Sequence, residues 1–157
     1  MNGLEQLYQQ VILDHSRQRT GNLPLTGGAP GESFGSSHQL NPVCGDEITL
    51  EVHIGADGSH SVRWDGDGCS ISMASASVLS ELVEESAPEE LVRIEAAFYE
   101  LMHSRGKGEA DEELLGDAAA FVGVSKFPAR VKCALLSWVA FKDALLQAHS
   151  LTPEERK

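Results

Sequence analysis

The sequence is poor in cysteine, in aromatic residues and in long apolar runs. Three of its 157 residues are cysteines, and 6% are aromatic. The apolar runs are only a few residues long, which is too short to cross a bilayer. The N-terminus lacks a basic segment followed by an apolar stretch, so no secretory signal is expected. We therefore expect a cytoplasmic protein that is not inserted in a membrane.

Basic residues are also scarce. The chain has 12 Lys and Arg against 24 Asp and Glu, and its formal net charge is −12. Such a surface repels nucleic acid and anionic membranes, so neither is an expected partner. The same charge would steer a partner that has a basic docking face, but it also serves solubility alone, and both readings stay open.

What remains is the composition of an ordinary globular protein, 41% hydrophobic and 23% charged. The length fits one domain, which we place at residues 1–150, with a frayed tail at 151–157. A chain of this length buries enough surface to fold without a disulfide or a structural metal.

Hydrophobic periodicity predicts an α+β fold. Alternation over residues 47–54 predicts a strand, residues 60–64 a returning strand, and residues 34–40 a weaker third one. Helical spacing occurs over 3–17, 69–83, 88–104, near 112–120, and from the SKFPAR segment to about 145. We expect a small three-stranded antiparallel sheet with helices packed on one of its faces.

Smaller features receive structural interpretations. Ser86–Ala87–Pro88–Glu89 predicts a capping box at the start of the helix over 88–104. The run SISMASAS at 70–77 reads as small residues that pack a helix against the sheet. None of the six histidines falls in a cysteine motif, so we interpret all of them as surface residues.

The three cysteines all lie at junctions between predicted elements. Cys44 lies in a turn that enters a strand, Cys69 opens a helix, and Cys133 lies in the first turns of the last helix. Three thiols cannot all pair within one chain, and a reducing compartment disfavours disulfides. They are thus inert core thiols, reactive thiols or metal ligands. A helix N-terminus lowers the pKa of a thiol, which favours thiolate at Cys69 and Cys133.

Asp46 follows Cys44 by two residues, and two such side chains share one side of an extended chain. Three thiolates and one carboxylate suit a tetrahedral Zn²⁺ site. Arg130 and Lys132 flank Cys133 and could offset part of the negative charge. The spacing is not that of a zinc finger, so on spacing alone buried bystander thiols remain an equal alternative.

Four segments of the chain resemble the SufU family, the zinc-dependent sulfurtransferases related to IscU-type iron–sulfur scaffolds. They are LYQQVILDH at 7–15, NPVCGDEITL at 41–50, GDGCSISMASASVLSELV at 66–83 and GVSKFPARVKCALLSW at 123–138. The resemblance runs from about residue 4 to about residue 145. Two features resemble SufU more than IscU: the long segment before the last motif, and Lys132 where IscU-type scaffolds have histidine.

The resemblance implies an IscU-like fold and a single Zn²⁺ held by Cys44, Asp46, Cys69 and Cys133. It also implies a partner, a pyridoxal-phosphate cysteine desulfurase of the SufS type, which itself carries the PLP. A histidine of that partner would displace Cys44 from the metal ion. Cys44 would then accept persulfide sulfur for the SUF cluster-assembly proteins, with Arg130 placed near the site. Two alternatives stay open: a scaffold that builds a cluster on the same ligands, and a structural zinc module.

Overall fold

The computed structural model describes residues 3–150. Three strands form an antiparallel sheet in the order β1-β2-β3, namely β1 (Ser33–Asn41), β2 (Asp46–Ile54) and β3 (His60–Asp67). The helices are α1 (Gly3–Gln18), α2 (Ser70–Glu85), α3 (Pro88–Met102), α4 (Glu112–Leu115), the 3-10 helix η1 (Gly116–Lys126) and α5 (Pro128–Ser150). The predicted α+β fold with a three-stranded antiparallel sheet is confirmed.

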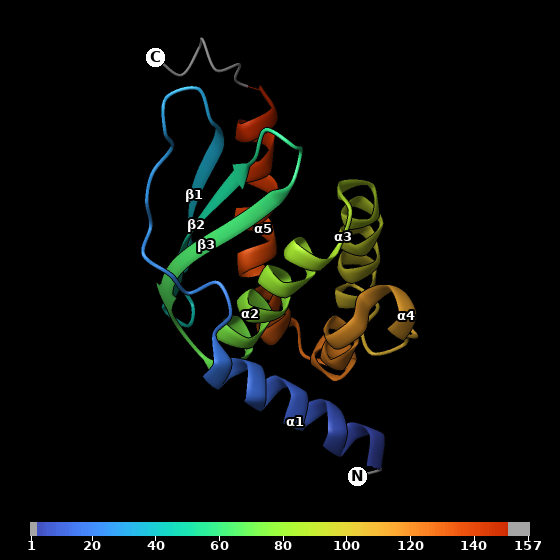
Figure 1. Cartoon of the computed structure of the whole chain (residues 1–157). Coiled ribbons are helices and arrows are strands. Elements are labelled where there is room, and N and C mark those ends of the chain that lie inside the picture. The colour runs from blue at the N-terminus through green and yellow to red at the C-terminus, as the bar shows by residue number, and fades with distance from the viewer. Residues whose placement is uncertain (1–2, 151–157) are drawn as a thin grey trace.

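The helices cover one face of the sheet, with α5 lying along it and α2 crossing near its end (Figure 1). Strand alternation explains this arrangement, because Ile48, Leu50 and Val52 of β2 all point toward the helices and are at most 1% exposed. At Gly35 of β1, an added Cβ would lie 1.8 Å from the carbonyl oxygen of Ala144. Glycine therefore allows α5 to approach the sheet closely.

Small side chains let α2 pack tightly against α5, whereas the prediction was that they pack a helix against the sheet. Ser75 donates a hydrogen bond to the carbonyl of Ala134 (2.6 Å) and accepts one from the indole of Trp138 (2.9 Å). The Trp138 ring also stacks on Phe98 of α3, with 4.1 Å between ring centroids. These contacts fix the start of α5, where Cys133 lies, relative to α2.

The segment between α1 and β1 runs along the outer side of the sheet (Figure 1). Trp64 donates its indole N–H to the carbonyl of Thr20 (2.8 Å), and further along Glu51 accepts the backbone N–H groups of Thr26 (3.0 Å) and Gly27 (2.9 Å). Glu51 is 4% exposed, so this carboxylate is a buried anchor for the segment.

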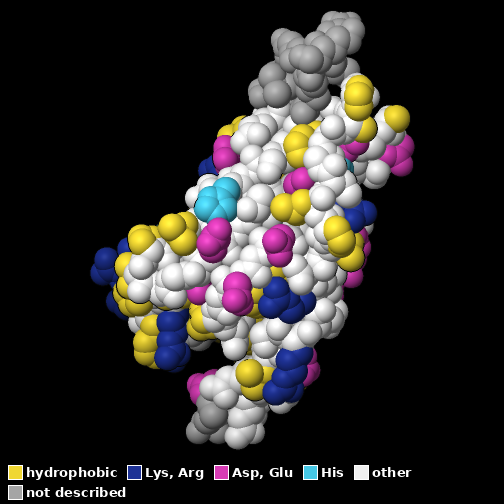
Figure 2. Space-filling model, turned by 90° about the vertical axis from the view of Figure 1, so that its left-hand side faces the viewer, with side chains coloured by type: hydrophobic (Ala, Val, Ile, Leu, Met, Phe, Trp, Pro, Cys, Tyr) yellow, Lys and Arg dark blue, Asp and Glu magenta, His cyan; other side chains and the backbone are white. Residues whose placement is uncertain are grey.

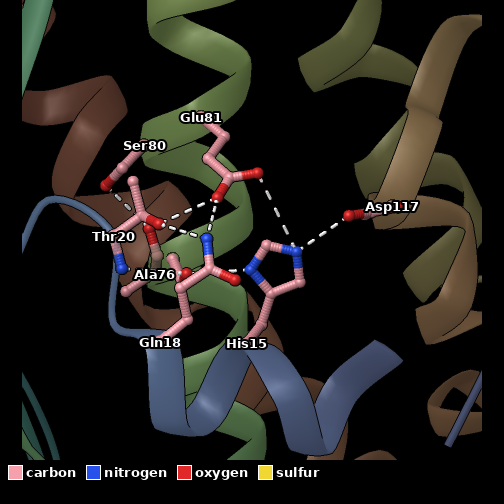
Figure 3. Close-up of polar contacts among 8 residues, drawn as sticks. His15, Gln18, Thr20, Ala76, Ser80, Glu81 and Asp117 are labelled. Carbon is pink, nitrogen blue, oxygen red and sulfur yellow. Dashed lines mark hydrogen bonds and ion pairs between the residues drawn. The ribbon is translucent and has the colours of Figure 1, made fainter. Parts of the chain in front are cut away.

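His15 of α1 is buried between three elements (Figure 3), so the prediction of six surface histidines is wrong for this residue. Its Nδ1 lies 2.8 Å from Ser77 Oγ of α2, and its Nε2 lies 2.8 Å from Asp117 Oδ2 of η1. Glu81 Oε1 lies 4.0 Å from the same Nε2. The imidazole thus ties the C-terminal part of α1 to α2 and η1. Near the start of α1, by contrast, the apolar side chains of Leu4 and Leu7 are exposed.

Several predicted features differ from the structure. β3 continues to Asp67, because Gly66 allows close pairing with β2, where an added Cβ would lie 2.4 Å from the carbonyl oxygen of Glu47. The expected helix near 112–120 is the short α4 followed by η1. Ser86 ends α2, and its backbone N–H donates to the Leu82 carbonyl. The N-cap of α3 is Ala87, which makes no side-chain hydrogen bond, so the predicted capping box is absent. The predicted tail at 151–157 lies outside the described residues.

Every helix within residues 3–150 is too short or too polar to span a bilayer. Figure 2 shows the outer side of the sheet, where acidic side chains are spread over the face and basic ones lie beside hydrophobic ones at the lower left. The negative charge on this face is therefore distributed, which favours solubility.

We expect Glu51→Gln to lower the free energy of unfolding at pH 7 by about 1–3 kcal/mol, because a buried charged acceptor is lost. Burial alone would raise the pKa of Glu51, but the hydrogen bonds from Thr26, Gly27 and His53 lower it below its ordinary 4.5. A carboxylate whose pKa is lowered by folding stabilises the fold at pH values above its pKa in the unfolded state. This stabilisation is lost as pH falls through its pKa in the folded state. The difference in free energy of unfolding between wild type and variant, measured by urea unfolding, should therefore narrow below about pH 4.5.

The matched control is Glu47→Gln, which changes an exposed carboxylate on the same strand and should leave stability nearly unchanged. If the free energies of unfolding of wild type and Glu51→Gln differ by the same amount at pH 7 and in acid, the charge of Glu51 does not anchor the segment.

Candidate metal centre

Cys44 lies on a tight turn between two paired strands. Asn41 and Asp46 are register partners at the ends of β1 and β2, so the chain reverses over residues 42–45. The Gly45 N–H bonds to the Asn41 carbonyl (2.8 Å), and Gly45 takes a φ of +76°, which favours glycine. Cys44 is exposed on this turn, whereas Asp46 is fixed in the sheet and 1% exposed.

Cys69 caps the N-terminus of α2. Its Sγ accepts the backbone N–H of Ser72 at 3.5 Å, and its own N–H donates to Asp46 Oδ1 at 2.9 Å. A Cβ added at Gly68 would lie 2.5 Å from the same Oδ1, so glycine is needed where the chain passes the carboxylate. The Gly-rich turn before Cys69 thus brings the start of α2 against the start of β2.

Cys133 faces this junction from α5 and is buried. Its Sγ lies 3.4 Å from Cys44 Sγ, 3.9 Å from Asn41 Nδ2 and 3.7 Å from the Ala129 carbonyl. Three distant parts of the sequence therefore meet at one point: the β1–β2 turn, the start of α2 and the second turn of α5.

The candidate ligand atoms of Cys44, Asp46 and Cys133 all lie within 4.8 Å of one another. Cys44 Sγ lies 3.1 Å from Asp46 Oδ2. Cys69 is not part of this tight group, but its Sγ lies 3.6 Å from the same Oδ2. The structure thus brings three predicted ligands together and places the fourth at their edge. The convergence of Cys44 and Asp46 results from the turn at Gly45 and not from an extended chain.

The spacing of Cys44, Asp46 and Cys133 fits three positions around a tetrahedral Zn²⁺ ion, and Cys69 lies outside this group. Zn–S bonds of about 2.3 Å and Zn–O bonds of about 2.0 Å put two sulfurs about 3.8 Å apart, and sulfur and oxygen about 3.5 Å apart. The contacts of 3.4 Å between Cys44 and Cys133, and of 3.1 Å between Cys44 and Asp46, are close to these values. The soft thiolates and the single carboxylate also match the ligand types that zinc takes.

Asp46 is ionised although it is buried. Burial alone would raise the pKa of its carboxyl group, but hydrogen bonds from Ser72, Cys133, Cys44 and the Cys69 backbone together lower the pKa to about 2. The carboxylate therefore offers a negative charge at the meeting point of the three thiols at any physiological pH.

The prediction that Cys133 is a thiolate because it lies near a helix N-terminus is wrong for the metal-free protein. Burial raises the pKa of this thiol, and contacts with Asp46, Cys44 and Cys69 raise it further. Cys133 is the sixth residue of α5, beyond the turn where the helix dipole acts most strongly. Without a cation the thiol keeps its proton, and ligation would have to remove it.

Arg130 lies three residues before Cys133 on α5 and does not touch the candidate ligands. Its guanidinium lies 5.2 Å from the centroid of the Phe127 ring, and within the described chain its side chain makes no hydrogen bond or ion pair with the four candidate ligands. Arg130 lines a cavity of about 660 Å³ together with Ile71 of α2 and Ile12 of α1. Its exposed position suits contact with an incoming group more than neutralisation of the centre. Lys132 is exposed and stands outside the tight group.

Sequence reasoning missed two residues that contact the candidate ligands. Asn41 accepts the N–H of Val43 (3.2 Å) and reaches Cys133 Sγ, so it shapes the turn that carries Cys44. Ser72 donates its hydroxyl to Asp46 Oδ2 at 2.5 Å. The available signal was its position three residues after Cys69, where the first turn of a helix folds back on its cap.

The chain is similar to several known proteins. The family described as "NifU-like N terminal domain" matches residues 7–134. A protein of Bacillus subtilis named "Zinc-dependent sulfurtransferase SufU" is 40% identical over 142 residues, which cover 90% of this chain and 91% of that protein. A protein of Streptococcus pyogenes named "Iron-sulfur cluster assembly scaffold protein IscU" is 34% identical over 92% of this chain and 86% of that protein.

A solved structure has the same fold. It is a "putative iron-sulfur cluster assembly scaffold protein for SUF system" from Fervidobacterium islandicum, and it aligns with a TM-score of 0.74. It is 29% identical, and the match covers 90% of this chain and 98% of that structure. The IscU-like fold that the resemblance implied is therefore confirmed.

The distances predict which thiols pair on oxidation of the metal-free protein. An azodicarboxamide-type oxidant that accepts two hydrogens should join Cys44 to Cys133 first, because their sulfurs lie 3.4 Å apart. Peptide mapping by mass spectrometry identifies the pair, and Zn²⁺ added beforehand should slow its formation. A first crosslink that contains Cys69 would contradict the arrangement of the centre, and Cys44→Ser is the control that should give no early crosslink.

Proposed function

This chain belongs to the NifU-like N-terminal domain family, and we propose that it is a zinc-dependent sulfurtransferase of the SufU type that serves iron–sulfur cluster assembly. The observation that carries this proposal is the meeting of an exposed thiol, Cys44, with the ionised Asp46 and the buried Cys133. The name of the Bacillus subtilis relative supports it. The proposed donor is a PLP-dependent cysteine desulfurase of the SufS type, and the proposed recipients are SUF cluster-assembly proteins.

The proposed metal ligands are Cys44, Asp46, Cys69 and Cys133. A bound Zn²⁺ ion would keep the thiols deprotonated without redox chemistry of its own, since the ion is d¹⁰. Asp46 contributes the harder, more weakly held donor, and its carboxylate is anchored by Ser72 and by the Cys69 N–H. The centre therefore combines a firm frame with one ligand, Cys44, on an exposed turn.

Cys44 is the proposed sulfur acceptor. Its thiolate attacks the outer sulfur of the persulfide on the desulfurase, a new S–S bond forms at Cys44 Sγ, and the donor's S–S bond breaks. The electron pair of the broken bond leaves with the donor cysteine as a thiolate, so no oxidant or reductant is needed. Cys133 suits this step less well because it is buried. Cys69 is exposed like Cys44, but its sulfur is engaged as the cap of α2.

Arg130 is proposed as the second residue of the transfer site. A persulfide arriving at Cys44 carries negative charge toward an acidic protein, and an exposed guanidinium beside the centre would favour its approach. The aromatic ring of Phe127 supports the guanidinium from one side. Arg130 thus acts on the incoming group and not on the metal ligands.

The second candidate function is a scaffold that assembles an iron–sulfur cluster on the same residues, which the name of the Streptococcus pyogenes relative favours. Thiolates are the usual cluster ligands, so the chemistry of the site alone permits it. Lys132 weighs against it, because it takes the place of a histidine that could serve as a further ligand. Protein purified without oxygen separates the two: one equivalent of zinc supports the transferase, and a transferable cluster supports the scaffold.

Cys44→Ala should abolish stimulation of the cognate desulfurase. We expect sulfide release in the presence of a thiol reductant to fall by roughly two orders of magnitude or more, to the rate of the desulfurase alone, as on removal of an essential nucleophile. Bound zinc, measured in parallel, shows whether the three remaining ligands still hold the ion. Stimulation that survives at full amplitude would rule out Cys44 as the acceptor.

Arg130→Ala should raise the concentration of this protein needed for half-maximal stimulation by about 3–30-fold, the effect of removing an exposed charge that meets a partner. Zinc content should stay unchanged, since Arg130 does not touch the ligands. Arg93→Ala, which removes an exposed arginine on α3, is the control and should have little effect. Loss of zinc from Arg130→Ala, or equal effects of both variants, would contradict the proposed role.

A further inference from the structure

Ser72 lies inside the candidate metal centre although it is not one of the candidate ligands. Its hydroxyl lies 2.5 Å from Asp46 Oδ2 and 3.3 Å from the carbonyl oxygen of Cys133. Its backbone N–H donates to Cys69 Sγ at 3.5 Å. Ser72 is 2% exposed, so water cannot replace these partners. One residue of α2 therefore contacts three of the four candidate ligand residues.

The hydroxyl has a single hydrogen, and the shorter contact assigns it to Asp46 Oδ2. The other oxygen, Oδ1, accepts the Cys69 N–H at 2.9 Å. Both oxygens of the carboxylate are thus held by donors from the first turn of α2. A carboxylate oxygen accepts more than one hydrogen bond or ligand bond, so Oδ2 can bond Ser72 and still face the thiols.

We infer that Ser72 is a positioning residue of this centre: its hydroxyl fixes the Asp46 carboxylate in the orientation that presents Oδ2 to the metal ion. This inference rests on the proposed zinc site. The hydrogen bonds from Ser72 and from the Cys69 N–H hold the carboxylate independently of Cys44, whose Sγ makes a further contact with Oδ2 at 3.1 Å. The turn at 42–45 can therefore carry Cys44 away from the centre to collect sulfur while Asp46 stays in place.

A purely structural role for Ser72 makes a different prediction. Ser80 of the same helix is also buried, and its hydroxyl donates to the Ala76 carbonyl within the helix at 2.8 Å. Removal of either hydroxyl changes the packing of α2, but only the Ser72 hydroxyl reaches a candidate ligand. An effect that passes through Asp46 must vanish once the Asp46 carboxylate has been removed.

The test is a double-mutant cycle on zinc affinity in the full-length protein. Dissociation constants for Zn²⁺ are measured by chelator competition for wild type, Ser72→Ala, Asp46→Ala and the double variant. Ser72→Thr, which keeps a hydroxyl, and Ser80→Ala are the controls. Cd²⁺, a softer ion that thiolates hold more tightly, is the probe for a variant too weak to measure with zinc. Thermal unfolding of the metal-free proteins shows that all of them fold.

We expect Ser72→Ala to weaken zinc binding by about 10–100-fold, the usual effect of losing a hydrogen bond to a metal ligand. In the Asp46→Ala background the same change should weaken binding by no more than about 2-fold, because coupled residues do not act additively. Ser72→Thr should recover most of the affinity, and Ser80→Ala should bind zinc like wild type.

The role of Ser72 would be overturned if Ser72→Ala weakened zinc binding equally with and without the Asp46 carboxylate, or if Ser80→Ala weakened it as much as Ser72→Ala does. Either result would leave the proposed function untouched. A wild-type protein that binds no zinc would overturn both. If the cycle shows coupling but Cys44 accepts no sulfur from a desulfurase, the role of Ser72 stands and the proposed transfer function fails.

Discussion

The buried carboxylate of Asp46 is the interaction on which the candidate centre depends. It begins β2, and its two oxygens accept hydrogen bonds from the start of α2, through the Cys69 N–H and the Ser72 hydroxyl. Cys44 and Cys133 bring the β1–β2 turn and α5 to the same point. Burial of an ionised carboxylate is costly unless it is paired, so the fold keeps these junctions together around it.

The rest of the fold supplies a rigid frame for this junction. The apolar side of β2, the close contact at Gly35 and the stacked Trp138 fix α5 against the sheet and α2. The turn at residues 42–45 stands outside that frame, and its cysteine is exposed. In the proposed function, this division would let Asp46, Cys69 and Cys133 hold the metal ion while Cys44 on the exposed turn reaches a partner, which a closed structural zinc site does not need.

Local patterns in the sequence predicted much of the fold. The alternation over 47–54 and the switch to helical spacing after Cys69 predicted the sheet and α2, whereas the set of four candidate ligands came from the resemblance to the SufU family. Other features depend on pairing between distant segments: Gly66 looks like a turn residue but lies in β3, and His15 is buried only because η1 and α2 meet α1. Ser72 looks like one small helix residue among several, and only the place of Asp46 across the junction sets it apart. The raised pKa of Cys133 likewise follows from burial, which no spacing reveals.

We propose that Cys44, on the turn outside this frame, accepts sulfur while zinc is the resident ion. The most direct measurement is a single turnover of the cognate desulfurase with cysteine and the zinc-loaded protein, followed by mass spectrometry of its peptides without reduction. We expect a mass increase of one sulfur atom on the peptide that carries Cys44, with zinc as the metal in the starting protein. Sulfur found only on Cys69 or Cys133, or a cluster in place of zinc, would contradict it.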